Sequence, residues 1–155
     1  MKTLYMLVGV PGVGKSTWLA TRMFDYNKTV VASTDSYIEK KAEEAGQSYN
    51  AMFNDLIKDA TTDMNEKITN AIKNNFDIVW DQTNVSASSR KKKLARIPKS
   101  YKKIAVVFTP PDADEHARRL ANRPGKTISP TVMSDMISKF QIPTIDEGFD
   151  EIVYA

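Results

Sequence analysis

The fold is decided by Gly9-Val10-Pro11-Gly12-Val13-Gly14-Lys15-Ser16, which fits the phosphate-binding pattern G-x-x-x-x-G-K-[ST] at every required position. An apolar run over residues 4–8 precedes this stretch, and a helix-forming run over 16–20 follows it. Glycines allow a tight bend that turns successive N–H groups toward one anion, and the first turn of a helix attracts negative charge. The stretch therefore predicts a strand, a phosphate-binding loop and a helix that begins at Lys15.

We expect this loop to bind a nucleoside triphosphate together with Mg²⁺. The lysine of the pattern, Lys15, reaches the β- and γ-phosphates, and the hydroxyl of Ser16 ligates the metal. The residues expected to contact the nucleotide are Gly9, Pro11, Gly12, Val13, Gly14, Lys15, Ser16 and Thr17. The alternative is a glycine-rich turn that binds nothing. It is disfavoured because the stretch matches the whole motif and lies between a predicted strand and a predicted helix.

The composition indicates one soluble globular domain over residues 1–155. The chain is 41% hydrophobic and 26% charged, which is ordinary for such a domain and sufficient for a core. It has no cysteine, which excludes disulfides and thiolate zinc sites and favours a reducing compartment. No apolar run approaches the roughly 20 residues of a membrane span, and the first strand begins too early to leave room for a signal peptide. We therefore expect a cytoplasmic protein.

Strand-like and helical segments alternate along the chain. Apolar strand-like runs recur at 3–8, 29–32, 78–80, 104–108 and 152–154. A long amphipathic helix spans about 49–75. A further helix starts at Asp112, with Glu115 placed as in a capping box, and another has Ser129 as N-cap and Pro130 at its first position. The alternation predicts an α/β fold in which helices cover both faces of a parallel sheet.

Ligands of open parallel sheets bind beyond the carboxyl ends of the strands, so polar residues that directly follow strand-like runs are site candidates. Asp35 follows 29–32, where its carboxylate can take a proton from an attacking hydroxyl or cap the next helix. The sequence is equally compatible with both roles. Asp81 follows 78–80, where an acidic residue organises magnesium in phosphate-loop enzymes; the alternative is a simple turn residue.

Two arginines, Arg119 and Arg123, stand four residues apart near the end of the helix that starts at Asp112. A Pro-Gly break follows them and favours a small mobile lid over about 122–129. Phosphoryl transfer needs positive charge over the equatorial oxygens of the transferred group, and arginines on a lid can supply it. The alternative is a solvated, charged helix end. We expect the two arginines to belong to the site.

Basic residues are concentrated in one segment of the chain. Eight Lys and Arg residues and no acidic residue lie between Arg90 and Lys103, whereas the last fifteen residues carry four acidic residues and no Lys or Arg. This asymmetry indicates a surface for a polyanion. The candidate nucleic-acid contacts are Arg90, Lys91, Lys92 and Lys93. The alternative for them is a solvated helix face.

The single histidine and the two tryptophans of the chain are expected to have structural places rather than catalytic roles. His116, the only histidine, lies in a very polar segment and is expected to be exposed. Trp18 and Trp80 are expected to be core residues.

In their order along the chain, the motifs resemble those of the kinase domain of phage polynucleotide kinase and of related small ATP-dependent kinases. The matching features are the loop at 9–16 with Thr17 and Trp18, Asp35 with Tyr37, Asp81-Gln82-Thr83-Asn84 followed by Arg90, and Arg119 and Arg123 before Ser129-Pro130. The resemblance implies an adenylate-kinase-like fold with five parallel strands in the order 2-3-1-4-5. It also implies transfer of the ATP γ-phosphate to a hydroxyl, most commonly the 5′-hydroxyl of a polynucleotide, so a nucleic acid is an implied partner.

The resemblance also assigns roles to single residues. Asp35 becomes the general base, Arg123 contacts the transferred phosphate, and Arg119 lies close to the nucleotide. Lys15 completes the catalytic set.

Two departures from the family pattern concern the acceptor. Ile38 stands where polynucleotide kinase has an arginine that holds the phosphate of the acceptor, and Thr34 stands where relatives often carry a basic residue. Three alternatives therefore stay open: a DNA kinase for a hydroxymethylated base of the hydroxymethyluracil type, a small-molecule or nucleoside kinase, and a nucleotide-dependent switch without transfer activity. Asp35 and the arginines argue against the switch. A phage-encoded protein of this kind would act in the host cytoplasm.

Overall fold

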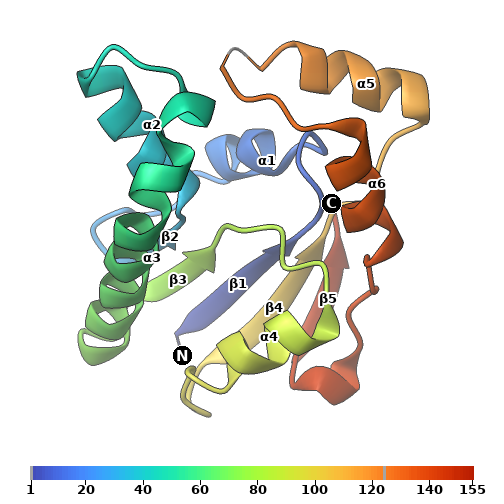
Figure 1. Cartoon of the computed structure of the whole chain (residues 1–155). Helices are drawn as coiled ribbons and strands as arrows, with labels where there is room; N and C mark the ends of the chain where they lie inside the picture. Colours follow the sequence, from blue (N-terminus) through green and yellow to red (C-terminus); the bar gives the residue numbers. More distant parts are fainter. Residues whose placement is uncertain (1, 124) are drawn as a thin grey trace.

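Five parallel strands form a single sheet in the order β2-β3-β1-β4-β5 (Figure 1). The computed structural model describes residues 2–123 and 125–155. The elements are β1 (Thr3–Val8), α1 (Lys15–Thr21), β2 (Thr29–Ala32), α2 (Asp35–Glu44), α3 (Tyr49–Lys73), β3 (Asp77–Trp80), α4 (Ala87–Leu94), β4 (Lys102–Val107), α5 (Ala113–Ala121), α6 (Pro130–Ser138), the 3₁₀ turn η1 (Ile145–Glu147) and β5 (Glu151–Tyr154).

The strand order confirms the order that the family resemblance implies. β1 lies in the middle of the sheet, where Leu4 is in register with Ile78 of β3 on one side and with Lys103 of β4 on the other. The connection from β1 to β2 passes over β3, which is inserted later in the chain. The carboxyl ends of all five strands consequently lie at one edge, which is where ligands bind in open parallel sheets.

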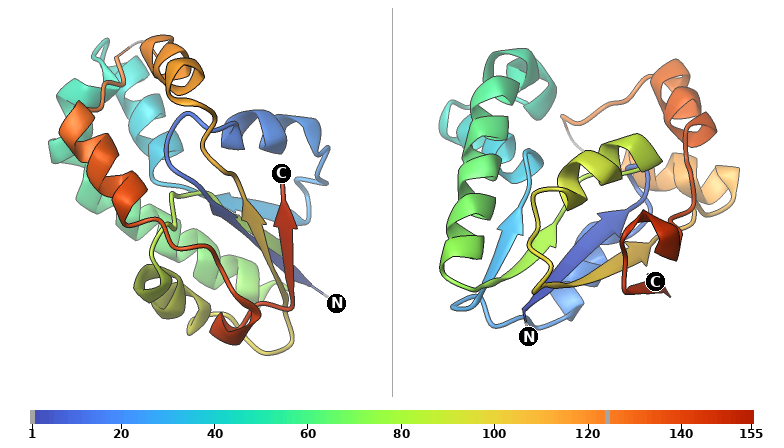
Figure 2. Two further views of the ribbon diagram at one scale, coloured as in Figure 1. Left: turned by 90° about the vertical axis from the view of Figure 1, so that its right-hand side faces the viewer. Right: turned by 90° about the horizontal axis from the view of Figure 1, so that it is seen from below.

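Alternate residues of the strands supply two separate cores. Leu4 and Met6 face the cluster that contains Met64 and Ile68 of α3, and all four are less than 5% exposed. Leu7 faces the opposite cluster, which contains side chains from α1, α5 and α6. α3 and α4 thus cover one face and α1 the other, as Figure 2 shows. Each large aliphatic side chain that is fully buried in this way stabilises the fold by about 1.5–3 kcal/mol.

The expected helix starts are also confirmed. α1 begins at Lys15, and the hydroxyl of Ser129 accepts a hydrogen bond from the Val132 amide at the start of α6, with Pro130 at the first helical position. Asp112 caps α5 by accepting from the Glu115 amide. The polar caps therefore located the helices more accurately than the apolar periodicity did.

Several boundaries differ from those expected by one or two residues, and the two largest differences are these. β4 starts at Lys102 rather than at residue 104, because Lys102 and Lys103 pair in register with Thr3 and Leu4 although their side chains are polar. The long helix ends at Lys73 rather than near residue 75. Among the described residues, no helix combines the length and the apolar character needed to cross a membrane.

Candidate functional site

The loop between β1 and α1 has a backbone that only glycine adopts without strain at two positions. Gly12 has φ 81° and Gly14 has φ 105°, both in the left-handed region. A Cβ on Gly12 would also lie 3.0 Å from the side chain of Leu120 in α5. Gly14 forms the N-cap of α1, and its carbonyl accepts a hydrogen bond from the Trp18 amide at 3.0 Å. The start of α1 is therefore aimed into the concave side of the loop.

The first glycine of the loop joins it to the segment that follows β3. The Gly9 amide donates to the Thr83 carbonyl at 2.9 Å. A Cβ on Gly9 would lie 2.9 Å from Val13 and 3.0 Å from the Cβ of Phe108, so a larger residue would displace the loop. Close packing on both sides of the loop holds its curvature before any ligand binds.

Lys15 is drawn back over the loop, where its ammonium donates to the Gly9 carbonyl at 2.6 Å. Burial lowers the pKa of Lys15 to about 8, and the carboxylates of Asp81 and Asp35 oppose that fall. Lys15 therefore shares the cavity with Asp81 and Asp35, the two carboxylates that the sequence predicted for the site, and interacts electrostatically with both.

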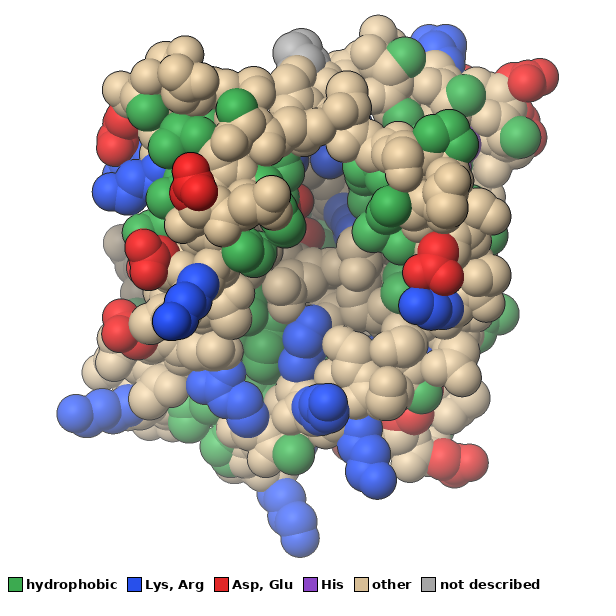
Figure 3. Space-filling model, viewed as in Figure 1, with side chains coloured by type: hydrophobic (Ala, Val, Ile, Leu, Met, Phe, Trp, Pro, Cys, Tyr) green, Lys and Arg blue, Asp and Glu red, His purple; other side chains and the backbone are tan. Residues whose placement is uncertain are grey.

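A cavity of about 910 Å³ lies over the loop and the carboxyl ends of the strands. Figure 3 shows a hollow in the middle of this face, with acidic and basic side chains visible inside it. The charged side chains that line the cavity are Lys15, Asp35, Glu39, Asp81, Arg119, Arg123 and Lys126. All five charged residues predicted for the transfer site are thus at one cavity, which Ser16 and Thr17 also line.

Asp35 does not act as a helix cap. α2 begins at Asp35 itself, the N-cap position belongs to Thr34, and the Thr34 side chain makes no capping hydrogen bond. The Asp35 carboxylate instead accepts a hydrogen bond from the Tyr49 hydroxyl at 2.6 Å, and the Lys126 ammonium lies 3.7 Å from its other oxygen. Of the two roles that the sequence left open, capping is therefore excluded.

Asp81 lines the cavity directly after the end of β3. Its amide donates to the Ala32 carbonyl at 2.8 Å, and its carboxylate makes no hydrogen bond to any other residue that the structure describes. Burial raises the pKa of Asp81, Lys15 opposes this rise, and Asp35 adds to it. A half-buried carboxylate without a protein donor beside a phosphate loop has the chemistry of a magnesium ligand, because Mg²⁺ prefers oxygen donors.

The two arginines reach the same cavity by different routes. α5 ends at Ala121, so Arg123 lies past the helix rather than one turn along it. Arg119 is oriented by Glu115, whose carboxylate accepts from its Nε at 2.9 Å. Nη1 of Arg123 is buried and has no hydrogen-bond partner among the described residues. Residues 122, 123 and 125–129 form neither helix nor strand, at the place expected for the lid, while Pro124 lies outside the described residues.

The sequence interpretation of His116 was wrong. The side chain is only 6% exposed, and its Nε2 lies 2.7 Å from the carbonyl oxygen of Pro11. A carbonyl oxygen can only accept, so Nε2 is the protonated nitrogen and donates to the phosphate loop. His116 thereby fastens α5, which carries Arg119, to the loop. The polar composition of α5 concealed this single inward-facing position.

Lys126 was also missed as a site residue. It lines the cavity, is only 18% exposed, and pairs with Glu39. Its ammonium lies 4.6 Å from the centre of the Tyr49 ring. The sequence offered one signal, a lysine directly after the Pro-Gly break of the lid.

The basic run on α4 divides into two environments. Arg90 is fully buried and paired with Glu147, so the prediction that it contacts nucleic acid is corrected: its guanidinium has no access to a ligand. Lys93 is half-buried, and donates to the side-chain oxygen of Asn84. Lys91 and Lys92 are exposed, and Lys and Arg side chains gather around α4 on the lower part of the face in Figure 3. A basic surface exists here, but without Arg90.

The two tryptophans also differ. Trp80 is 1% exposed in the core, as expected, whereas Trp18 is only partly buried and packs against the opposite cluster. The guanidinium of Arg22 lies over its ring, 5.1 Å from the centroid.

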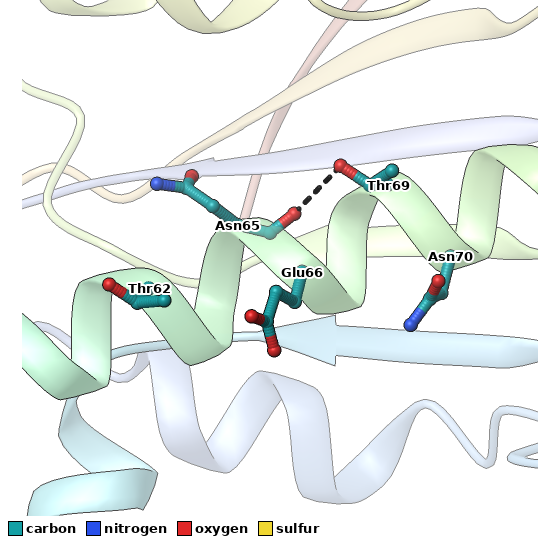
Figure 4. A pocket seen from close by; sticks show the side chains of 5 residues that line it. All are labelled: Thr62, Asn65, Glu66, Thr69 and Asn70. Atoms are coloured by element: carbon teal, nitrogen blue, oxygen red, sulfur yellow. Dashed lines mark hydrogen bonds between the residues drawn. The ribbon is translucent and has the colours of Figure 1, made fainter.

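A smaller depression of about 440 Å³ lies on α3 and is unrelated to this site. Its side chains all come from one helix, and the single hydrogen bond among them runs from the Thr69 hydroxyl to the Asn65 carbonyl (Figure 4). A shallow face of one helix encloses no ligand.

Almost the whole chain aligns with part of a longer curated protein. The chain is 24% identical over 158 residues to heterogeneous nuclear ribonucleoprotein U-like protein 2 of Mus musculus, an alignment that covers 97% of this chain and 21% of that protein. The chain therefore spans about a fifth of the length of the curated relatives it matches.

Solved structures with the same P-loop kinase fold include a "putative kinase" of Chloroflexus aurantiacus J-10-fl, with a TM-score of 0.71, 15% identity, and coverage of 99% of this chain and 84% of that one. A fungal RNA kinase has a TM-score of 0.51 at 19% identity, with 99% of this chain and 74% of that chain covered. Residues 4–143 match the sequence profile of AAA_33, described as an AAA domain, and the chain belongs to this family.

Proposed function

We propose that the protein is an ATP-dependent phosphotransferase that moves the γ-phosphate to a hydroxyl group. The observation that carries this proposal is the convergence of a phosphate loop, two carboxylates and two arginines on one cavity. Phosphoryl transfer through a loose transition state depends chiefly on positioning and on neutralising charge, and this set of groups supplies both.

The donor side of the cavity would hold the triphosphate. The inward-facing amides of the loop and the Lys15 ammonium bind the β- and γ-phosphates. Ser16 and Asp81 would hold Mg²⁺, and the unpartnered carboxylate of Asp81 fits that role. Among the described residues, no group of three or more His, Cys, Asp or Glu could bind a metal alone. Magnesium at phosphoryl-transfer sites needs only one or two protein oxygens besides phosphate and water, and it neutralises phosphate charge there.

The transfer step follows from the places of Asp35 and the arginines. The acceptor hydroxyl gives its proton to the Asp35 carboxylate while its oxygen bonds to the γ-phosphorus. The bond from that phosphorus to the β–γ bridging oxygen breaks, its electron pair stays on that oxygen, and ADP leaves. Arg119 and Arg123 neutralise charge on the equatorial oxygens of the transferred group, and the unpartnered Nη1 of Arg123 is a donor available for one of them.

A polynucleotide 5′-hydroxyl is the first candidate acceptor. The motif resemblance supports it, and a structure that shares the fold is named an RNA kinase. Lys91 and Lys92 add an exposed basic surface on α4 that would attract a phosphate backbone, with half-buried Lys93 beside them. DNA and RNA remain equal candidates for this strand.

A second candidate rests on the helix that carries Asp35. Ile38 is 0% exposed, and the neighbouring position that faces the cavity is Glu39, an acid. The lysines of α2, Lys40 and Lys41, do not line the cavity, so the part of this helix that does line it offers no cation to a phosphate that flanks the acceptor hydroxyl. This favours an acceptor without an adjacent phosphate, such as a hydroxymethylated base in DNA or a small molecule.

A transfer assay tests the proposal and separates the acceptors. The protein is incubated with γ-labelled ATP and Mg²⁺, and with a 5′-hydroxyl DNA, a 5′-hydroxyl RNA, a hydroxymethyluracil-containing duplex, free nucleosides or no acceptor. We expect label on one acceptor class, loss of label in EDTA, and a large fall in the labelling rate, to a measurable residual level, with Asp35→Asn. Nucleotide binding without label on any acceptor would contradict the proposal and indicate a nucleotide-dependent switch.

A further inference from the structure

Both oxygens of the Asp35 carboxylate have neighbours from distant parts of the chain. The Tyr49 hydroxyl, from the first residue of α3, donates to Oδ1 at 2.6 Å. The Lys126 ammonium, from the segment between α5 and α6, lies 3.7 Å from Oδ2, beyond hydrogen-bonding distance. The Asp35 side chain is 53% exposed, so packing alone does not hold it in one rotamer.

The groups around Tyr49 are themselves held in place. The Tyr49 ring packs on Phe53 with 5.7 Å between centroids, and the Lys126 ammonium lies over the same ring. The next residue, Asn50, binds the lid segment: its amide donates to the Gly125 carbonyl at 3.0 Å, and its side chain donates to the Thr127 carbonyl at 3.1 Å. The first turn of α3 therefore sets the positions of both neighbours of the carboxylate.

The Tyr49 hydroxyl is suited to be a permanent donor. Burial raises the pKa of Tyr49, and the hydrogen bond to the Asp35 carboxylate raises it further. The hydroxyl consequently stays protonated at neutral pH, well below even the ordinary tyrosine pKa. Because the hydroxyl binds Oδ1, Oδ2 is left without a hydrogen bond among the described residues and is free to accept a proton.

We propose that Tyr49 is a positioning residue for the general base: its hydroxyl holds Asp35 so that Oδ2 receives the proton of the acceptor. This inference rests on the proposed phosphotransferase function. It adds the start of α3 to the acceptor side of the site, a role that the sequence motifs did not indicate.

The test is Tyr49→Phe, which removes one oxygen and keeps the ring that contacts Phe53 and Lys126. We expect kcat for transfer to the acceptor found in the assay above to fall about tenfold to a hundredfold, because a misplaced catalytic group costs about that much. We expect the KM for ATP to change less than twofold and the Tm to stay within 2 °C. The matched control is Tyr26→Phe, which also removes one phenolic oxygen and keeps the ring that packs on Phe24. The Tyr26 hydroxyl makes no hydrogen bond within the described chain and lies outside the cavity lining, so its loss should leave kcat unchanged.

A double-mutant cycle with Asp35→Asn supplies the readout that a merely structural role would not move. Tyr49→Phe should have no further effect on kcat when Asp35→Asn is already present, since the group it positions is gone. The inference would be overturned if Tyr49→Phe had the kcat of the wild type, or if it lowered kcat equally in the wild type and in Asp35→Asn. In either case, transfer by the wild type would still support the proposed function. Absence of transfer by the wild type would overturn both.

Discussion

The guanidinium of Arg90 donates to both carboxylate oxygens of Glu147, through Nε at 2.7 Å and Nη2 at 3.1 Å. Its remaining Nη1 donates to the Asn84 carbonyl at 2.9 Å, and the arginine side chain is fully buried. Burial alone would raise the pKa of Glu147, but the hydrogen bonds from Arg90 and Thr144 outweigh it and lower that pKa. The pair joins α4 to η1, the turn that leads into β5, and thus fastens the edge strand to the sheet.

Replacement of Arg90 should therefore reduce stability rather than nucleic-acid binding. Arg90→Gln removes a fully buried cation from its ion pair and leaves the half-buried Glu147 carboxylate without its charged partner, so we expect the free energy of unfolding to fall by about 3 kcal/mol. Urea denaturation followed by circular dichroism measures this change. Lys91→Gln on the same helix is the control and should change stability by less than about 0.5 kcal/mol. Equal stability of the two variants would contradict the assignment.

Lys15 should lower stability while enabling activity. Its folded pKa of about 8 lies below the ordinary value of 10.5, so the folded protein binds fewer protons than the unfolded chain between these pH values. The free energy of unfolding therefore rises with pH between about pH 8 and 10.5 as far as this lysine is concerned. Below about pH 8, Lys15 destabilises the folded state to its full extent. We expect Lys15→Met to be more stable than the wild type at pH 7, by at most about 3 kcal/mol, and inactive.

The pH dependence supplies the check for Lys15. Unfolding measured at pH 7 and at pH 10 should show the advantage of Lys15→Met shrinking at the higher pH. In the wild type, kcat/KM for ATP should fall above about pH 8, as the free enzyme loses the ammonium that binds phosphate. A stability difference that is independent of pH would show that the lysine is not destabilised by burial.

Arg123 should contribute to the transfer step and little to folding. Its Nη1 has no partner among the described residues, so Arg123→Ala removes a donor from the cavity without breaking a described hydrogen bond of that atom. We expect kcat to fall at least about a hundredfold, the loss typical of one removed transition-state donor. Arg118→Ala is the control, because Arg118 is 68% exposed and absent from the cavity lining. Similar rates for both variants would place Arg123 outside the mechanism.

His116 should affect nucleotide binding through the loop it holds. His116→Phe removes the donor to the Pro11 carbonyl and leaves a buried acceptor unpaired, so we expect a loss of about 1 kcal/mol in stability and a higher KM for ATP. His116→Gln can present an amide donor to the same carbonyl and should recover part of both losses. Thermal unfolding together with steady-state kinetics measures the two effects. Unchanged KM in His116→Phe would show that the loop needs no support from α5.

Local patterns were good predictors of the donor side of the site. The phosphate loop is continuous in sequence, and its glycines at φ 81° and 105° sit where the motif requires them. The places of Asp35 and Asp81 at the cavity could be predicted because parallel strands bring their carboxyl ends to one edge, while their catalytic roles stay a prediction. These inferences needed only the order of the elements and the direction of the strands.

Contacts across the chain were harder to predict. Arg90 and Lys91 are neighbours in a uniformly basic run, yet one is fully buried and the other exposed. His116 sits in a polar helix and still turns inward to the loop. Nothing within either segment reports which side of the helix meets the sheet, since that depends on the packing of elements dozens of residues away.

The sequence by itself determined the phosphate loop, the parallel α/β architecture and the two carboxylates, because each follows from residues that are adjacent or from the geometry of parallel strands. Only the tertiary structure decided the partners of those groups. It brought Tyr49 and Lys126 to Asp35, and it paired Arg90 with Glu147. The physical reason is that a hydrogen bond or an ion pair depends on separation in space, and chain folding sets that separation independently of distance along the sequence.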